Sequence, residues 1–362
     1  MIPQRLAFID WMKVLGMLVI VLGHTGAQEL LAPTPPFNFK QLGVAFFVFV
    51  MGYSLAGETR APWLVFYNRI FEVWLFGLAF ALVMSLATWL TIRDLAESNY
   101  LPLFFGANVA FNFFPANPTT WYIGTYFHLL LLWVLVLRRI QVRPWMIVLS
   151  FGAEIVIRAA LIPSAGGLVA YMALTNWGTV LLLGLWSGQQ RQVSVPKGNG
   201  LYALAGELIA LLVLLALWPA MLARMEVAEE FPFALVGSST SPVPWLATSA
   251  AVSFLYLAHT WLIFRVTQRL PSLKGVEFLA RNTLIVFIVH MPLIYWLCPH
   301  FYPLVPQGGL RVLTNVFLFF LLPACLSELI RWTIRPVWWR DRLRERVLAR
   351  WTKALPTPGC AP

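Results

Sequence analysis

The chain has 362 residues, of which 60% are hydrophobic and only 11% are charged. A soluble domain carries about 25% charged residues, so a water-exposed fold around one core is excluded and a bilayer must solvate much of the surface. The formal net charge of +11 does not indicate a nucleic-acid partner, because the cations cluster between apolar runs.

A helix needs about 20 apolar residues to cross a bilayer, and about ten such stretches follow one another along the chain. We therefore predict an all-α, polytopic transmembrane helix bundle. The expected spans are 8–27, 41–57, 70–92, 120–137, 145–162, 168–187, 201–218, 245–264, 282–298 and 312–334. The first stretch contains Asp10 and Lys13 and is followed by no convincing cleavage site, so we expect a retained helix and not a signal peptide.

Lys and Arg in short loops mark the cytoplasmic side of a membrane. Alternate loops hold most of the cations, which predicts an even number of spans with both termini in the cytoplasm. We expect a transmembrane domain over 1–337 and a basic cytoplasmic tail over 338–362. The cations and tryptophans between Arg335 and Lys353 indicate either a helix on an anionic inner leaflet or an ordinary stop-transfer flank.

Metal and disulfide chemistry are not indicated by the sequence. Cys298, Cys325 and Cys360 have no spacing typical of a disulfide framework or a metal site. No cluster of carboxylates and histidines has ligand spacing either. We expect no metal and no permanently bound cofactor.

The first helix carries Asp10, Lys13 and His24, and ionisable groups inside a membrane usually face a polar interior. Asp10 and Lys13 are neighbours at i,i+3 and can pair. Lys13 and His24 are eleven residues apart and share that face. The rise of a helix separates them by roughly 16 Å, so a partner for His24 must come from another span. The prediction depends on both side chains facing one water-reachable passage.

Several motifs, taken in order, resemble the acyltransferase 3 family of membrane acyltransferases. They cover nearly the whole chain: Arg5-x4-Asp10-x2-Lys13-x10-His24, Phe46-Phe47 through Gly52-Tyr53, Trp121-Tyr122, Phe287 to Pro292 with His290, and Glu328 with Arg335-Pro336. The plain layout, without a fused soluble domain, is similar to exopolysaccharide acetylases of the xanthan type.

This resemblance implies transfer of an acyl group, commonly acetyl, from cytoplasmic acyl-CoA to a sugar at or beyond the outer face. Its Arg/Lys-x10-His motif corresponds to Lys13 and His24. The family usually has Arg-x-x-Arg entering the third helix, whereas this chain has Arg69 followed by Glu72, so donor binding there rests on Arg69 alone. The common Ser before Gly in the second helix is Met51.

The chemistry of ester formation supports these roles independently. A sugar hydroxyl is a weak nucleophile and needs a base, and histidine suits that task. CoA carries phosphates, which cations must hold. We expect His24 to be the base, with Asp10 either at the catalytic site or only neutralising Lys13. Lys13 and Arg69 are expected to bind the donor.

Five other residues are candidates for the acceptor site, each with a structural alternative. Trp121 and Tyr122 either stack on a sugar or belong to an interfacial aromatic belt. Glu154 and Arg158 either line the acceptor site or neutralise each other at i,i+4. His290 either contacts substrate or makes an ordinary buried polar contact. His128, His259 and Glu72 are weaker candidates.

The expected partners are membrane lipids, acyl-CoA and a carbohydrate acceptor, polymeric or lipid-linked. The expected setting, inferred from the family, is a bacterial inner membrane. The alternative from another class is a transporter or flippase for a glycan or lipid-linked intermediate; such proteins often show internal repeats, and none is visible here. A non-catalytic scaffold would not need Asp, Lys and His on one intramembrane face.

Overall fold

The computed structural model describes residues 6–25, 40–92, 106–107, 121–190, 200–224 and 242–354. These residues form helices and connecting turns, with no strand among them. The helices are α1 (Ala7–His24), α2 (Lys40–Ala56), α3 (Pro62–Ile92), α5 (Trp121–Leu135), α6 (Pro144–Ala165), α7 (Gly167–Met172), α8 (Gly178–Gln189), α9 (Gly200–Arg224), α10 (Pro242–Thr267), α11 (Lys274–Phe301), α12 (Gly309–Val316), α13 (Leu322–Ile334) and α14 (Pro336–Ala354).

The predicted polytopic helix bundle is confirmed. Within the described residues, seven helices are long and apolar enough to cross a membrane, and Lys40–Ala56 and Tyr202–Leu214 are shorter apolar helices. Many large apolar side chains on the outside are exposed, such as Val148 and Leu149 of α6 and Ile209 and Leu212 of α9. Water would penalise such a surface, whereas lipid tails solvate it.

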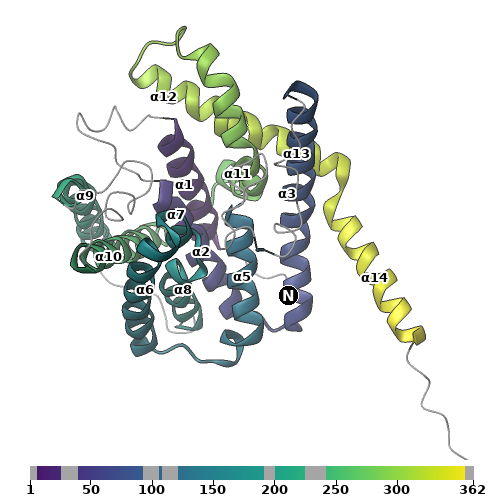
Figure 1. Ribbon diagram of the computed structural model, residues 1–362, viewed down its shortest axis with the longest axis horizontal. Coiled ribbons are helices and arrows are strands. Elements are labelled where there is room, and N and C mark those ends of the chain that lie inside the picture. Colours follow the sequence, from purple (N-terminus) through teal and green to yellow (C-terminus); the bar gives the residue numbers. More distant parts are fainter. Residues whose placement is uncertain are drawn as a thin grey trace, which may run out of the picture.

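Helices α1 and α2 form the centre of the bundle. Figure 1 shows them between α3, α11 and α13 on one side and α6, α8, α9 and α10 on the other. Glycines allow the closest approaches, because a Cβ on Gly43 of α2 would overlap the carbonyl oxygen of Gly16 in α1. A Cβ on Gly184 of α8 would likewise overlap the carbonyl oxygen of Phe49 in α2. Small residues permit such contacts between membrane helices, and the contacts fix where α1 lies.

The prediction of one continuous helix over 168–187 is wrong. The chain forms the short helix α7, a 3-10 turn over Leu174–Asn176, and then α8. The break brings Asn176 and the backbone N–H of Thr179 to the buried Arg158 and Glu154 of α6, with Arg158 Nε donating to Asn176 Oδ1 at 2.6 Å. Helices α3 and α11 also begin about two turns earlier than expected, at Pro62 and Lys274.

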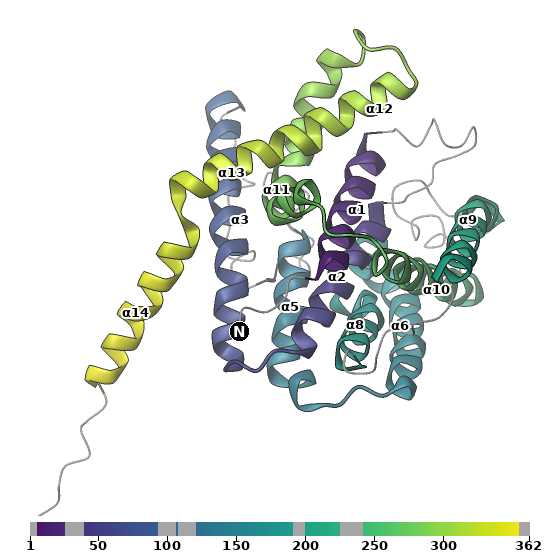
Figure 2. The same ribbon diagram turned by 180° about the vertical axis from the view of Figure 1, so that it is seen from behind.

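The C-terminal helices follow one another with two irregularities. A π-helical segment, Phe317–Leu321, joins α12 to α13, and Arg335 has φ 50, which separates α13 from α14. Helix α14 contacts α3, where Tyr67 donates from Oη to the carbonyl oxygen of Arg340 at 2.9 Å. Figure 2 shows α14 leaving the bundle beyond α3.

Candidate functional site

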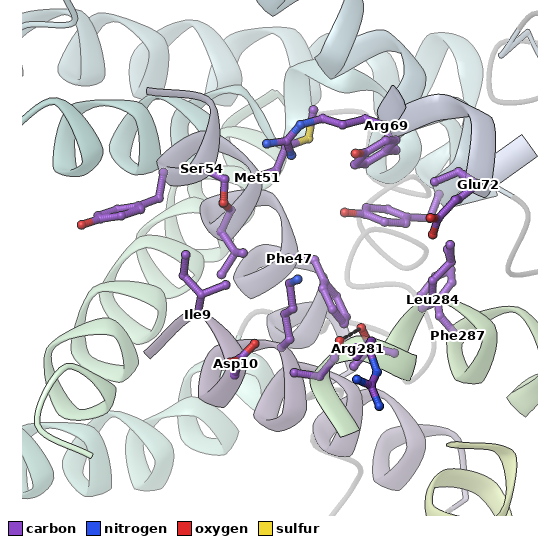
Figure 3. Close-up of a pocket in the computed structure, with 18 of the residues that line it drawn as sticks. Ile9, Asp10, Phe47, Met51, Ser54, Arg69, Glu72, Arg281, Leu284 and Phe287 are labelled. Carbon is purple, nitrogen blue, oxygen red and sulfur yellow. Dashed lines mark hydrogen bonds between the residues drawn. The ribbon is translucent and has the colours of Figure 1, made fainter. Parts of the chain in front are cut away.

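A cavity of about 830 Å³ lies between α1, α2, α3, α5, α11 and α13. Its charged lining residues come from four helices: Asp10, Lys13, Arg69, Glu72, Arg281 and Arg331. Figure 3 shows Arg69 on one side, with Asp10 and Arg281 on the other. A cavity of this size is typical of a cofactor or substrate site.

The first turns of α1 supply Asp10 and Lys13 to this cavity. The i,i+3 spacing places both on one face of α1, as predicted. Asp10 is buried and Lys13 is half-buried. The opposite wall carries Arg69 and Glu72 at the same spacing on α3.

Among the described residues, four cationic side chains and two carboxylates line the cavity. Glu72 is engaged by Arg331, with Oε2 and Nη1 3.3 Å apart, and Arg281 pairs with Glu328 at 3.0 Å. Glu58, in the loop before α3, is neutralised by Arg60, whose side-chain hydrogen bond holds the pKa of Glu58 below its ordinary value. With Glu328 included, these described side chains leave one net positive charge, which favours an anionic group such as a phosphate of the donor.

Two buried polar atoms in the cavity wall lack partners among the described residues. They are Oδ1 of Asn68, an acceptor, and Nε of Arg331, a donor. Buried polar atoms are almost always hydrogen-bonded, so the missing partner of each of these two atoms needs an explanation. A ligand with both donors and acceptors would satisfy them.

Arg331 is a site residue that the sequence did not reveal. It comes from α13, more than 250 residues after Glu72, yet it pairs with Glu72 and lines the cavity. Glu72 stands where the family usually has a second arginine. The structure therefore restores a guanidinium to this region from another helix. Two signals in the sequence could have indicated it: Arg331 is a charged residue inside the predicted span 312–334, and the carboxylate of Glu72 needs a counter-charge.

The far end of α1 brings His24 to His290 of α11. Their ring centroids are 5.4 Å apart. His290 is fully buried, its Nδ1 lies 2.7 Å from the carbonyl oxygen of Phe287, and its Nε2 has no partner among the described residues. A carbonyl can only accept, so Nδ1 carries the proton and Nε2 is left as an acceptor. His290 is thus a neighbour of His24 from another span, as a partner would have to be if His24 acts as a base.

Lys13 and His24 do not line the same cavity in this structure. Lys13 faces the cationic cavity, whereas neither His24 nor His290 is among its lining residues. The structure therefore does not show the predicted common passage as one cavity, and Phe47, Tyr122 and Phe287 line the cavity on the side of Lys13. Phe287 also contacts the histidine pair, because its ring centroid is 5.7 Å from that of His290.

The tryptophan and tyrosine at the start of α5 pack against each other, with ring centroids 5.7 Å apart, but differ in their other contacts. Tyr122 lines the cationic cavity, and its ring packs against Phe287. Trp121 is not among the lining residues and packs on its other side against Tyr171 and Trp177, with ring centroids 4.9 Å and 6.3 Å away.

Glu154 and Arg158 lie elsewhere, between α6, α8 and α10. Both are almost fully buried and form an ion pair with each other. Arg158 also donates to Asn176, to the carbonyl oxygen of Ser249 and to Ser253. This arrangement corresponds to the self-neutralising alternative, and neither residue lines the cavity.

Neither His128 nor His259 lines the cavity. Nδ1 of His259 lies 2.9 Å from the carbonyl oxygen of Leu255. Within the part of the chain that the structure describes, no three His, Cys, Asp or Glu side chains are placed to hold a metal ion.

Comparison with known proteins identifies the family. The sequence pattern described as an acyltransferase domain, that of the acyltransferase 3 family, matches residues 6–338. No curated protein and no solved structure matches the chain. Because the match covers nearly the whole chain and includes the cavity, the histidine pair and the helices that build them, this protein is a membrane acyltransferase of the acyltransferase 3 family.

Proposed function

We propose that this protein is an O-acyltransferase that moves an acyl group, by default acetyl, from cytoplasmic acyl-CoA to a sugar hydroxyl. The acceptor is an exopolysaccharide or another cell-surface glycan, and the enzyme works in a bacterial inner membrane. The likeness of its layout to xanthan-type acetylases favours an exopolysaccharide.

One observation carries the proposal. Helix α1 presents Lys13 to a cation-rich cavity at one end and His24 to a buried histidine at the other. The first place suits the phosphates of CoA, because guanidinium and ammonium groups form strong charge-assisted hydrogen bonds with phosphate. The second suits proton transfer, because imidazole is the side chain best fitted to accept a hydroxyl proton near neutral pH.

The reaction follows from these two places. Lys13, Arg69 and Arg331 hold the donor phosphates. His24 accepts the proton as the sugar oxygen attacks the thioester carbonyl, so that a C–O bond forms and the C–S bond breaks. The proton then passes from His24 to the departing thiolate, which leaves as CoA thiol. His290, with its tautomer set by the Phe287 carbonyl, positions His24 or the hydroxyl through Nε2.

The test compares purified, reconstituted wild type with His24→Ala and His290→Ala, using labelled acetyl-CoA and candidate glycans. Loss of a general base typically costs about 10²- to 10⁴-fold in rate, and we expect His24→Ala to fall in that range. His300→Ala is the matched control, because His300 is an exposed histidine at the end of α11 and does not line the cavity.

A folded His24→Ala protein with undiminished transfer would remove His24 from this role. Wild-type protein that moves a glycan across the membrane but transfers no acyl group would favour a transporter instead.

A further inference from the structure

Three aromatic side chains, here called the aromatic layer, line the cationic cavity, and one of them, Phe287, also packs against His290 of the histidine pair. The three are Phe47 of α2, Tyr122 of α5 and Phe287 of α11. The Phe287 ring centroid is 5.2 Å from that of Tyr122 and 6.4 Å from that of Phe47. Phe287 of α11 therefore packs against one ring from α2 and one ring from α5.

Phe287 connects the aromatic layer to the histidine pair. Phe287 contacts His290, which in turn contacts His24, with ring centroids 5.7 Å and 5.4 Å apart. Nε2 of His290 is buried without a partner among the described residues. Because native proteins rarely leave such an atom unpaired, this nitrogen points to a polar group that arrives from elsewhere.

The donor must cross the aromatic layer for the two ends of α1 to act on one reaction. Lys13 and His24 are roughly 16 Å apart along α1, so a donor held by its phosphates near Lys13 must extend toward the histidines. The pantetheine arm and its thioester are the slender part of acyl-CoA. Only this arm and the acyl group it carries suit a passage made by turning one aromatic ring aside.

We propose that the aromatic layer is a gate for the acyl-bearing arm of the donor, and that Phe47 and Phe287 limit the acyl group to a short chain. This proposal rests on the proposed acyl transfer and specifies its donor class: CoA thioesters of acetyl size. The rings take no part in bond making. They determine which thioester carbonyl reaches His24 and His290.

Removing a ring should relax the limit. We expect Phe287→Ala and Phe47→Ala to raise the rate of butyryl transfer relative to acetyl transfer by about 10-fold or more, since one methylene in an apolar pocket changes selectivity by roughly 10- to 200-fold. The reconstituted enzyme is assayed with acetyl-, propionyl-, butyryl- and octanoyl-CoA. A larger ring should have the opposite effect, so Phe47→Trp should lower acetyl transfer while the Kd for CoA stays unchanged.

Phe80→Ala is the matched control. Phe80 lies on α3 and lines a separate apolar groove of about 410 Å³ with Val289 and Pro292 of α11. Its removal should leave the preference among the four thioesters unchanged. Thermal unfolding and CoA affinity of every variant show whether the fold persists. If both alanine variants fail to fold, the gate is tested with Phe47→Trp, which keeps a ring in place, by its rate of acetyl transfer and its Kd for CoA.

The outcomes separate the two proposals. If the wild type transfers acetyl but the folded ring variants keep its chain-length preference, the gate is overturned and the acyltransferase proposal stands. If Phe47→Trp weakens CoA affinity and transfer together, the ring belongs to the donor-binding wall and the gate is also overturned. If the wild type uses no CoA thioester at all, the proposed function fails.

Discussion

At the cationic cavity, Arg331 of α13 supplies a positive charge beside Glu72 of α3. Glu72 and Arg331 form an ion pair with both side chains largely shielded from solvent. The Arg331 guanidinium also lies 5.7 Å above the Phe76 ring. These contacts orient Arg331 and leave its Nε available to a ligand.

We predict that Arg331→Ala weakens CoA binding. Hydrogen bonds to charged groups contribute about 1.5–3 kcal/mol, which corresponds to roughly a 10- to 100-fold rise in Kd. The rise should appear in the KM for acetyl-CoA more than in kcat, and Arg331→Lys should recover part of the loss. Arg344→Ala is the control, because Arg344 pairs with Asp341 on α14, away from the cavity. Equal effects of both alanine variants would contradict a specific role.

The buried Glu154–Arg158 pair is expected to act on stability. Removing one partner leaves an uncompensated charge, so Arg158→Ala should cost about 3–5 kcal/mol of unfolding free energy, measured by denaturation in detergent. The double replacement Glu154→Leu/Arg158→Met should cost less. Arg60→Ala, at an exposed pair, should change stability by less than about 1 kcal/mol. Unchanged stability of Arg158→Ala with impaired use of the acceptor would instead support the acceptor-site role.

Helix α2 is the element on which the site depends most. It packs against α1 through Gly43 and against α8 through Gly52, Gly184 and Gly188. The contact between Gly43 and α1 positions α1, and therefore positions Lys13 and His24. Phe47 and Met51 on the same helix line the cavity.

We predict that Gly43→Ala is destabilising, by about 1–3 kcal/mol, because overpacking forces the neighbouring backbone to move. Its Cβ would overlap the carbonyl oxygen of Gly16 and approach Cγ1 of Ile20 to 2.6 Å. Gly152→Ala is a matched control on α6, since a Cβ there meets nothing within 4 Å. Alanine favours helix over glycine, so the control should be neutral or gain up to about 1 kcal/mol. Similar losses in both variants would argue against close packing at Gly43.

At the scale of the whole molecule, the alternation of Lys and Arg between loops predicts both termini in the cytoplasm. A fluorescent reporter that matures only in the cytoplasm, fused after Ala354, should therefore be bright. A phosphatase that folds only outside, fused at the same place, should be inactive. The opposite pattern would invert the membrane orientation and place the cationic cavity away from cytoplasmic acyl-CoA.

The sequence by itself determined the class of the fold and the face of α1 that carries Asp10 and Lys13. Apolar runs long enough to span a bilayer leave few alternatives to helices, because every backbone N–H and C=O in lipid must be paired within its own segment. Helical spacing placed Asp10 with Lys13 and separated both from His24. The acyltransferase family was likewise visible in the order of short motifs.

Only the tertiary structure decided which helices meet. Periodicity predicts which face of a helix is buried but not which helix packs against that face. It could not predict that His24 lies beside His290 or that Arg331 pairs with Glu72. Nor could it predict that Phe47, Tyr122 and Phe287 come together from three helices. The broken helix before α8 was missed for a related reason. Residues 168–187 carry no charge and are mostly apolar, and the break around Asn176 is stabilised by contacts with Arg158 and Glu154, which come from another helix.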